Sequence, residues 1–458
     1  MNRFLAVPLL LLAPATVCQD PADVLARFRI DGRPTVVTRA DTALEMAFHL
    51  RRRERGREAT DLLVDAELTR RAAQRAGCMP TPQEVEPYWR ALQEQLRAAG
   101  HSPADFPAIR NTGREQWLAD LAVQVAQERL VRNELRLGAE EEVSPDMLKL
   151  WLQEERRRVG VVTDQDELPA GAAAKVGETQ IPLIDLGLLL LRTSEDHERD
   201  KYVQQVIRLQ LVEALGRRHD VELTAADLDA AIATRRAEIA REPRYGGMSY
   251  EQLLQTEGMT IAALRELRVF RAQVLLDKVA AKLFPAGELL AELQRDRQHV
   301  LDLVGPRRHL GTILVRALEE PNGLVPRDFA AAERHLQEVT RRLDEETFAN
   351  VAAIESEDPR TKGAGGDAGW HRRRSGELPD ALLAAAFALA PGEVSAPVRT
   401  EEGVWLVKVF AVDPPPTDEQ LVARLRQYKS LELSQQLVRE AEIEYGSGDA
   451  AGTAEAPR

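Results

Sequence analysis

The sequence predicts a mainly helical protein of the α+β class, divided into several domains. Its 458 residues are too many for one compact core, and two to four domains are typical of this length. Charged residues make up 29% of the chain and aromatic residues 5%, and long stretches rich in Ala, Leu, Arg and Glu favour helices. Short β-prone segments interrupt these stretches. In chain order they separate a leader, two similar helical modules, a mixed domain and a C-terminal extension.

Residues 1–18 have the composition of a secretory signal peptide. Arg3 precedes a short apolar run, small residues follow the run, and Ala-Pro-Ala at 13–15 offers a cleavage site. The run is too short for a membrane span, and no later segment is apolar enough for an integral span. We therefore expect an exported, periplasmic protein. Cys18 leaves open a lipid anchor at the outer face of a membrane, but the Thr-Val before it fits a lipoprotein signal poorly.

The charge pattern argues against a nucleic-acid partner. The formal net charge is −13 at pH 7, whereas nucleic-acid-binding proteins concentrate positive charge. The run Arg-Arg-Arg-Glu-Arg at 51–55 is basic enough for a phosphate-binding patch, but we interpret it as a solvated helix face. The sequence contains no zinc-ligand spacing, nucleophile elbow or dinucleotide motif, so we expect neither a metal nor a cofactor.

Residues 19–160 and 175–304 repeat one arrangement, joined by a linker at 161–174 that contains Pro, Gly and several alanines. Each copy begins with a predicted β-hairpin, near 29–38 and 174–184. Amphipathic helices follow, at 62–68 and 203–215. The next helix of each copy begins with Thr and an acid three residues later: Thr81 with Glu84, and Thr224 with Asp227. A last long helix closes each copy, at 117–135 and 261–283.

Residues 305–413 form the mixed domain, and 414–446 form an extension. The domain runs through a strand near 308–315, an acidic loop, a Gly-Gly-Asp turn at 365–367, a short apolar helix, a Pro-Gly-Glu turn and two closing strands. Three prolines then lead to a helix of about 22 residues capped by Thr417 and a short strand at 441–445. Residues 447–458 are rich in Gly and Ala and are predicted to be disordered.

This order of motifs resembles the parvulin (rotamase) family of peptidyl-prolyl isomerases. The stretch from Ile354 reads I-E-S-E-D-P-R-T-K-G-A-G-G-D-A-G-W, and G-E-L-P-D-A-L-L-A-A-A-F follows. The resemblance covers roughly 306–413 and implies a four-stranded antiparallel sheet wrapped by helices. It also implies a substrate, the X-Pro peptide bond, whose slow isomerisation can limit folding.

The two preceding modules resemble the N-terminal chaperone domain of SurA and of related secreted foldases such as PrsA. The family's entry hairpin, V-N-G-x-x-I-T, corresponds here to I-D-G-R-P-T-V at 30–36. The resemblance implies that the modules bind unfolded or nascent exported proteins that contain proline. It further implies that the C-terminal segment returns to the first hairpin, with Ile443 and Tyr445 pairing there. The alternative is a helical array that binds no client.

An X-Pro isomerase needs no covalent intermediate and no cofactor. Rotation about the planar imide costs about 18–20 kcal/mol, and a catalyst gains by binding the twisted imide better than either planar form. An apolar socket for the proline ring, hydrogen bonds to the rotating carbonyl and exclusion of water all contribute.

The parvulin resemblance places both family histidines at other residue types. The first-strand position is Thr312, and the last-strand position is Trp405. His309 lies three residues before Thr312, so the alternation of side chains along a strand places it on the opposite face. We expect Thr312 and Trp405 to face the same concave side as Leu378 and Asp358.

Other family positions are matched more closely. Asp358, in Ser-Glu-Asp-Pro, matches the acidic or thiol residue beside the substrate carbonyl, and Thr400 matches the threonine after the Pro-Val turn. The pocket's Met and Phe correspond to Leu378 and Leu382, and Phe387 matches a core Phe. The predicted catalytic residues are Asp358, Thr312 and Thr400. The predicted substrate-binding residues are Leu378, Leu382, Trp405 and Phe387.

Two functions are compatible with these residues. One is an exported folding factor that binds unfolded clients and isomerises X-Pro bonds weakly. The other is a non-enzymatic chaperone or scaffold with a degenerate parvulin domain. The missing histidine pair favours the second, whereas the retained acid, threonine, turn and apolar helix favour the first.

Overall fold

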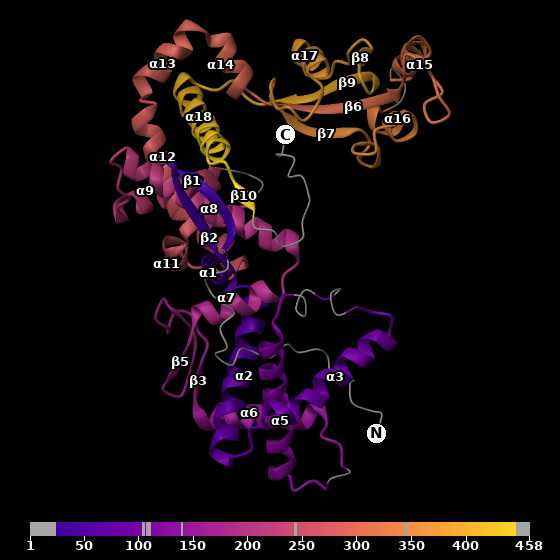
Figure 1. The fold of residues 1–458 in the computed structure, drawn as a ribbon. Helices are drawn as coiled ribbons and strands as arrows, with labels where there is room; N and C mark the ends of the chain where they lie inside the picture. The colour runs from indigo at the N-terminus through magenta and orange to yellow at the C-terminus, as the bar shows by residue number, and fades with distance from the viewer. Residues whose placement is uncertain are drawn as a thin grey trace. The chain divides into compact units, whose positions relative to one another are not determined.

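The computed structural model describes residues 24–445, apart from 103–105, 107–110, 139–140, 242–244 and 344–346 (Figure 1). The predicted signal peptide with Cys18 and the predicted disordered tail lie outside the described residues. The described chain is mainly helical with small antiparallel sheets, which confirms the predicted fold class. Contacts divide the described chain into two units, residues 24–276 with 436–445 and residues 277–435.

The first unit begins with the predicted hairpin. Strands β1 (Val24–Ile30) and β2 (Arg33–Thr38) pair antiparallel, and Asp31 and Gly32 make the turn with φ of 51° and 74°. Strand β10 (Glu444–Tyr445) pairs with the other edge of β1, which gives the order β10-β1-β2. The predicted return of the C-terminal segment to the first hairpin is therefore confirmed, although the paired residues are Glu444 and Tyr445 and do not include Ile443.

One helix of the first copy begins at its predicted start signal. Thr81 and Glu84 form a capping box, in which each side chain accepts a hydrogen bond from the other residue's backbone N–H. The helices are α1 (Arg39–Leu50), α2 (Glu54–Ala76), α3 (Pro82–Ala98), α5 (Arg114–Glu134) and α6 (Pro145–Val159).

The second copy differs from its prediction in two places. The expected linker at 161–174 contains strand β3 (Val161–Val162) and the start of β4 (Ala172–Val176), because the small side chains at 172–174 are buried in the core. With β5 (Thr179–Pro182) they form a sheet of order β3-β4-β5. The predicted helix at 261–283 is broken at Leu267, whose backbone is extended. The helices are α7 (Leu183–Arg192), α8 (Asp196–Arg218), α9 (Ala225–Arg241), α10 (Tyr250–Thr256), α11 (Ile261–Glu266) and α12 (Arg268–Leu283).

The two repeated modules share one core. Met46 and Leu68 from the first copy belong to the same cluster of buried side chains as Leu186 from the second. Helices α1 and α7 approach so closely that a Cβ on Gly187 would lie 2.0 Å from the carbonyl oxygen of Ala43. The repeats are therefore halves of one folded unit. By their contacts, residues 277–304, predicted as the end of the second module, belong to the second unit.

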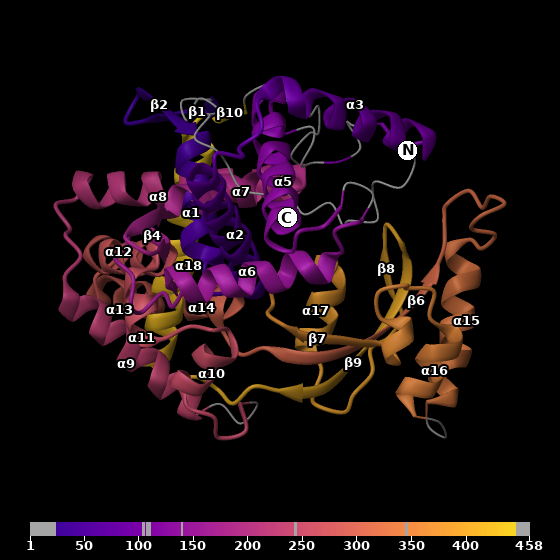
Figure 2. The same ribbon diagram turned by 90° about the horizontal axis from the view of Figure 1, so that it is seen from below.

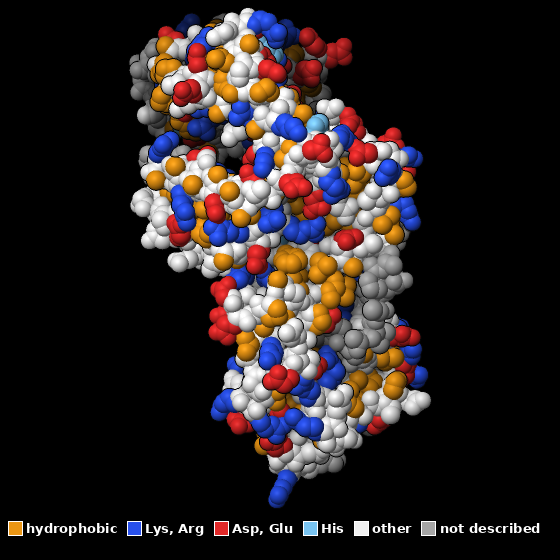
Figure 3. All heavy atoms as spheres, turned by 90° about the vertical axis from the view of Figure 1, so that its left-hand side faces the viewer, with side chains coloured by type: hydrophobic (Ala, Val, Ile, Leu, Met, Phe, Trp, Pro, Cys, Tyr) orange, Lys and Arg blue, Asp and Glu red, His pale blue; other side chains and the backbone are white. Residues whose placement is uncertain are grey.

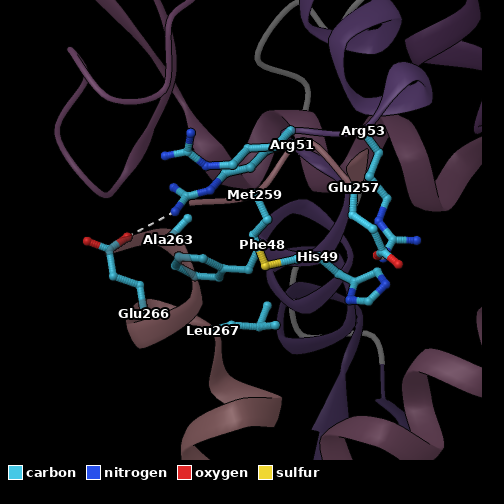
Figure 4. Close-up of a pocket in the computed structure, with 10 residues that line it drawn as sticks. Phe48, His49, Arg51, Arg53, Glu257, Met259, Ala263, Glu266 and Leu267 are labelled. Atoms are coloured by element: carbon cyan, nitrogen blue, oxygen red, sulfur yellow. Dashed lines mark hydrogen bonds and ion pairs between the residues drawn. The ribbon is translucent and has the colours of Figure 1, made fainter. Parts of the chain in front are cut away.

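The basic run at 51–55 joins these halves and is not a solvated helix face. Arg51 is buried and pairs with Glu266 (Figure 4), with 3.0 Å between the guanidinium and the carboxylate. Arg53 pairs with Glu257 at 3.1 Å. Arg52 pairs with Asp166 at 2.7 Å. The sequence prediction was wrong here because each acid is distant along the chain, Glu266 by 215 positions. Each of these three arginines is therefore paired with an acid of the linker or of the second copy.

A buried ion pair also links the two copies. Asp120 of α5 accepts from Arg192 of α7 at 2.9 Å, and the side chains are only 3% and 6% exposed. Gln116 donates to the other carboxylate oxygen at 2.9 Å. Burial raises the pKa of the Asp120 carboxyl to about 7, and the charge of Arg192 opposes this rise. The pair fixes α5 against α7 at a cost in desolvation.

The second unit contains a small helical cluster and the mixed domain. Helices α13 (Ala286–Arg295) and α14 (Arg297–Val304) pack on the N-terminal half of α18 (Asp418–Glu440) through a cluster that includes Leu289, Val300 and Leu421. Thr417 caps α18, as predicted, by accepting from the backbone N–H of Gln420.

The mixed domain contains the predicted four-stranded antiparallel sheet, and its strand order is β7-β6-β9-β8. One face is covered by α15 and α16, and the other by α17 (Figure 1; Figure 2). Its elements are β6 (Arg308–Arg316), α15 (Phe329–Arg342), α16 (Phe348–Glu355), η3 (Lys362–Ala364), β7 (Asp367–His371), α17 (Asp380–Ala388), β8 (Val398–Thr400) and β9 (Gly403–Val412).

Within the described ranges, every helix is too short or too polar to cross a bilayer. On the face shown in Figure 3, basic and acidic side chains are interspersed, and neither sign forms a continuous patch.

Candidate active site

Strand β6 places its side chains alternately on the two faces of the sheet. Leu310 and Leu314 belong to the buried cluster that includes Leu382 of α17, called the α17 cluster below. Ile313 belongs to the buried cluster that includes Leu336 of α15 and Val351 of α16, called the α15–α16 cluster below. Thr312 therefore lies on the α17 face. Trp405 of β9 and Leu378 belong to the same α17 cluster. The predicted side for these residues is confirmed.

His309 lies on the opposite face, also as predicted. Its ring stacks on Trp370 with centroids 5.3 Å apart and meets Phe410 edge-on at 5.3 Å. Phe410 in turn contacts Phe348 of α16. The His309 Nε2 atom lies 2.7 Å from the carboxylate of Asp367. His309 is thus held in an aromatic cluster and does not replace a histidine of the α17 face.

A chain of hydrogen bonds joins the predicted catalytic residues Thr312 and Asp358 through Thr361. The Thr361 hydroxyl donates to Asp358 Oδ2 at 3.2 Å, and the hydroxyls of Thr312 and Thr361 are 3.3 Å apart. Since the one proton of Thr361 goes to the carboxylate, Thr312 is the donor of the second bond. Thr312 and Asp358 are 0% and 1% exposed.

Arg360 connects this buried chain to solvent. Its backbone N–H and its Nε both donate to Asp358 Oδ1, at 3.1 and 2.9 Å, while its side chain is 54% exposed. The hydrogen bond to Asp358 raises the pKa of the Arg360 guanidinium. The carboxylate is thus stabilised by partners on both oxygens, and the guanidinium extends toward the surface.

The other predicted catalytic residue, Thr400, is separate from this chain. Its hydroxyl accepts from the indole Nε1 of Trp405 at 2.9 Å and donates to the carbonyl of Gly403 at 3.3 Å. An open hollow beside it is lined by Leu318, Glu319, Glu320, Phe329, Arg399, Thr400 and Glu401. Thr400 therefore fixes the indole and borders a hollow, whereas Asp358 and Thr312 form the buried chain.

The predicted substrate-binding residues are mostly core residues. Leu382 and Trp405 are 0% exposed and Leu378 is 8% exposed, and all three pack in the α17 cluster. Phe387 is partly buried, with the guanidinium of Arg308 4.9 Å from its ring centroid. A proline ring cannot contact Leu382 or Trp405 in this arrangement unless side chains move. The indole fills the place where the family has a histidine.

The sequence reasoning missed Thr361 and Arg360. Both follow Asp358 in Asp-Pro-Arg-Thr, and an Asp whose side chain accepts from the backbone two residues later is an Asx turn. That local signal was available, because Asp and Pro are strong turn formers. The long-range bond to Thr312 is visible only once β6 lies beside this loop.

The comparisons with known proteins agree with this architecture. Residues 313–411 match the rotamase family model, a PPIC-type PPIase domain. The chain is 29% identical over 219 residues to a Chaperone SurA of Chromohalobacter salexigens, covering 46% of each chain. It is 29% identical over 173 residues to a Foldase protein PrsA of Geobacillus kaustophilus, covering 38% of this chain and 52% of that protein. The chain spans about half the length of the curated relatives it matches.

A solved peptidylprolyl isomerase (PrsA) from Bacillus anthracis aligns with 52% of this chain and 94% of its own at 18% identity, with a TM-score of 0.24. The family and sequence matches confirm the resemblance read from the motifs: the chain carries a PpiC-type domain and is similar to SurA and PrsA.

Proposed function

We propose that this chain is an exported folding factor that binds unfolded proteins and isomerises their X-Pro bonds slowly. The observation that carries the proposal is the buried chain from Asp358 through Thr361 to Thr312, on the face where α17 packs, inside a segment that matches a PpiC-type domain. The similarity to SurA and PrsA supports unfolded proteins as clients. The signal-like leader supports export to the periplasm.

Among the hydrogen-bonded residues Asp358, Arg360, Thr361 and Thr312, Arg360 is the one placed to contact a substrate. Thr312 and Thr361 have each committed their proton to a neighbouring oxygen, whereas the guanidinium reaches solvent with several donors. A donor to the prolyl nitrogen stabilises the twisted imide, because rotation takes the nitrogen lone pair out of conjugation and makes it a better acceptor. Asp358 holds this donor in place by accepting from its Nε. The rate is low because Thr312 and Trp405 replace two ring donors.

One observation favours a second function, a non-enzymatic chaperone. Leu382 and Trp405 have no exposed surface, so the apolar socket is filled by the protein's own side chains. In that case the domain contributes binding surface and stability only.

Two measurements on the full chain separate these functions. Exchange between the cis and trans forms of a short Ala-Pro peptide, followed by NMR, is expected to accelerate in its presence and to slow again with Arg360→Ala. No acceleration at equimolar protein would favour the non-enzymatic chaperone. Suppression of aggregation of an unfolded secreted protein tests client binding, and no suppression at several-fold molar excess would contradict both functions.

A further inference from the structure

His371, unlike His309, lies on the α17 face of the sheet. His371 ends β7 and pairs across the sheet with Arg308, whose guanidinium donates to the backbone carbonyls of Ala386 and Leu389. Partners in an antiparallel ladder point to the same face, so His371 shares this face with Thr312. Its side chain is only 6% exposed.

Both ring nitrogens of His371 have partners. Nε2 lies 2.6 Å from the carbonyl oxygen of Ala368 in β7, and Nδ1 lies 3.0 Å from the carboxylate of Glu377. The Ser375 hydroxyl is also 3.4 Å from Nδ1. The ring therefore donates from Nε2 to the strand in either charge state. Nδ1 either donates to Glu377 or accepts from Ser375, so protonation does not leave the ring without a partner.

These bonds close the loop at 372–379, which carries Leu378. Gly376, with φ of 72°, supplies the left-handed turn that brings Glu377 back to the ring. Leu378 follows and is buried in the α17 cluster, and α17 then begins after Pro379 without any side-chain cap. The contacts of His371 therefore fix the chain just before an otherwise uncapped helix start.

We propose that His371 is a positioning residue that clamps this loop onto β7 and thereby sets Leu378 at the proline site. The substrate part of this inference rests on the proposed function, because Leu378 matters for proline only if the domain binds X-Pro peptides. The loop part does not, because loop order can be measured without a substrate.

The loop contains three arginines at 372–374, which are trypsin sites and report on opening of the loop. Arg374 is exposed. Brief digestion of the full chain with trypsin, analysed by mass spectrometry, should cleave there about tenfold faster in His371→Ala than in the parent, since local opening controls cleavage. Glu377→Ala, a change at a mostly exposed side chain, should give a smaller increase. The double variant should be cleaved no faster than His371→Ala, because both changes remove one interaction.

His335→Ala is the matched control. It removes a His–Glu pair of the same length, His335 to Glu355 at 3.0 Å, between α15 and α16 on the other face. Cleavage at 372–374 should stay at the parent rate in this control. An equal increase in His335→Ala, or parent-like cleavage in both His371→Ala and Glu377→Ala, would overturn the clamp.

Affinity for an X-Pro peptide gives the second readout. His371→Ala should weaken binding about fivefold, with a higher KM at unchanged kcat. The reason is that the change displaces Leu378 but leaves the hydrogen bonds between Asp358, Thr361 and Thr312 in place. A released loop with unchanged affinity would overturn the positioning role. If the parent binds no X-Pro peptide while the variant releases the loop, the proposed function fails and only the clamp remains.

Discussion

The two faces of the four-stranded sheet differ in how deeply their polar residues are buried and in what those residues contact. On the α17 face, Thr312 and Asp358 are fully buried and each is bonded to Thr361. On the α16 face, His309 is 27% exposed and lies among aromatic rings, bonded to Asp367. Both faces hold a polar group on the same strand, three residues apart.

The difference shows that the alternation of side chains along a strand decides which residue can contribute to a site on a given face. A histidine is present in the first strand, but it points away from α17, and the position that points toward α17 is a threonine. The residue type alone would have assigned His309 to the isomerase chemistry. The face on which each side chain lies is the reason why we propose Asp358 and its partners for this chemistry.

The largest expected difference between the faces is in stability. Trp405→Ala removes a fully buried indole and its hydrogen bond to Thr400, and should lower the free energy of unfolding of the domain by about 3–5 kcal/mol. Trp370→Ala, at a 42% exposed position, should cost less than about 1 kcal/mol. Chemical denaturation measures both, and similar losses would contradict the burial difference.

Gly311 tests how tightly the aromatic side chains of the α16 face are packed. A Cβ there would lie 2.5 Å from Phe410 and 2.7 Å from Phe348. Gly311→Ala should therefore destabilise the domain by about 1–3 kcal/mol through overpacking. Gly363 has open space at its Cβ, and Gly363→Ala is the control that should leave stability unchanged. If both changes are neutral, the aromatic cluster is looser than the contacts indicate.

Restoring the family's histidine pair tests the α17 face by gain of function. Thr312→His combined with Trp405→His should raise kcat/KM for an X-Pro peptide about tenfold, a barrier change of about 1.4 kcal/mol. The loss of the buried indole makes a folded near-ultraviolet circular dichroism spectrum a necessary control. A folded double variant with parent-like activity would show that the histidine positions do not limit the rate.

A small stability effect is also expected at His309. His309→Ala removes two ring contacts and a partly exposed bond to Asp367, so the free energy of unfolding should fall by only about 1 kcal/mol. Thermal unfolding of the full chain measures it. A loss as large as that of Trp405→Ala would mean that the α16 face stabilises the sheet as much as the α17 face does.

Local patterns predicted much of this molecule. The first hairpin, the capping box at Thr81 and the opposite placement of His309 and Thr312 follow from turn chemistry and periodicity. The four-stranded sheet wrapped by helices followed from the resemblance to the parvulin family. The shared core of the two repeats did not, nor did the pairing of Arg51 with Glu266. Those contacts join segments more than a hundred residues apart, and no local pattern encodes which distant surface will meet. The filled socket also escaped prediction, because sequence shows residue types and not their exposure.

Two single substitutions, one on each face, test the central claim most directly. We would measure kcat/KM for X-Pro isomerisation by the full chain carrying Asp358→Asn or His309→Ala. Asp358→Asn keeps the side-chain shape but removes the charge that holds Arg360, and should lower kcat/KM about tenfold or more. His309→Ala should change it by less than about twofold, because the ring lies on the other face. Unchanged activity in Asp358→Asn, or a large loss in His309→Ala, would contradict the assignment of the chemistry to the α17 face.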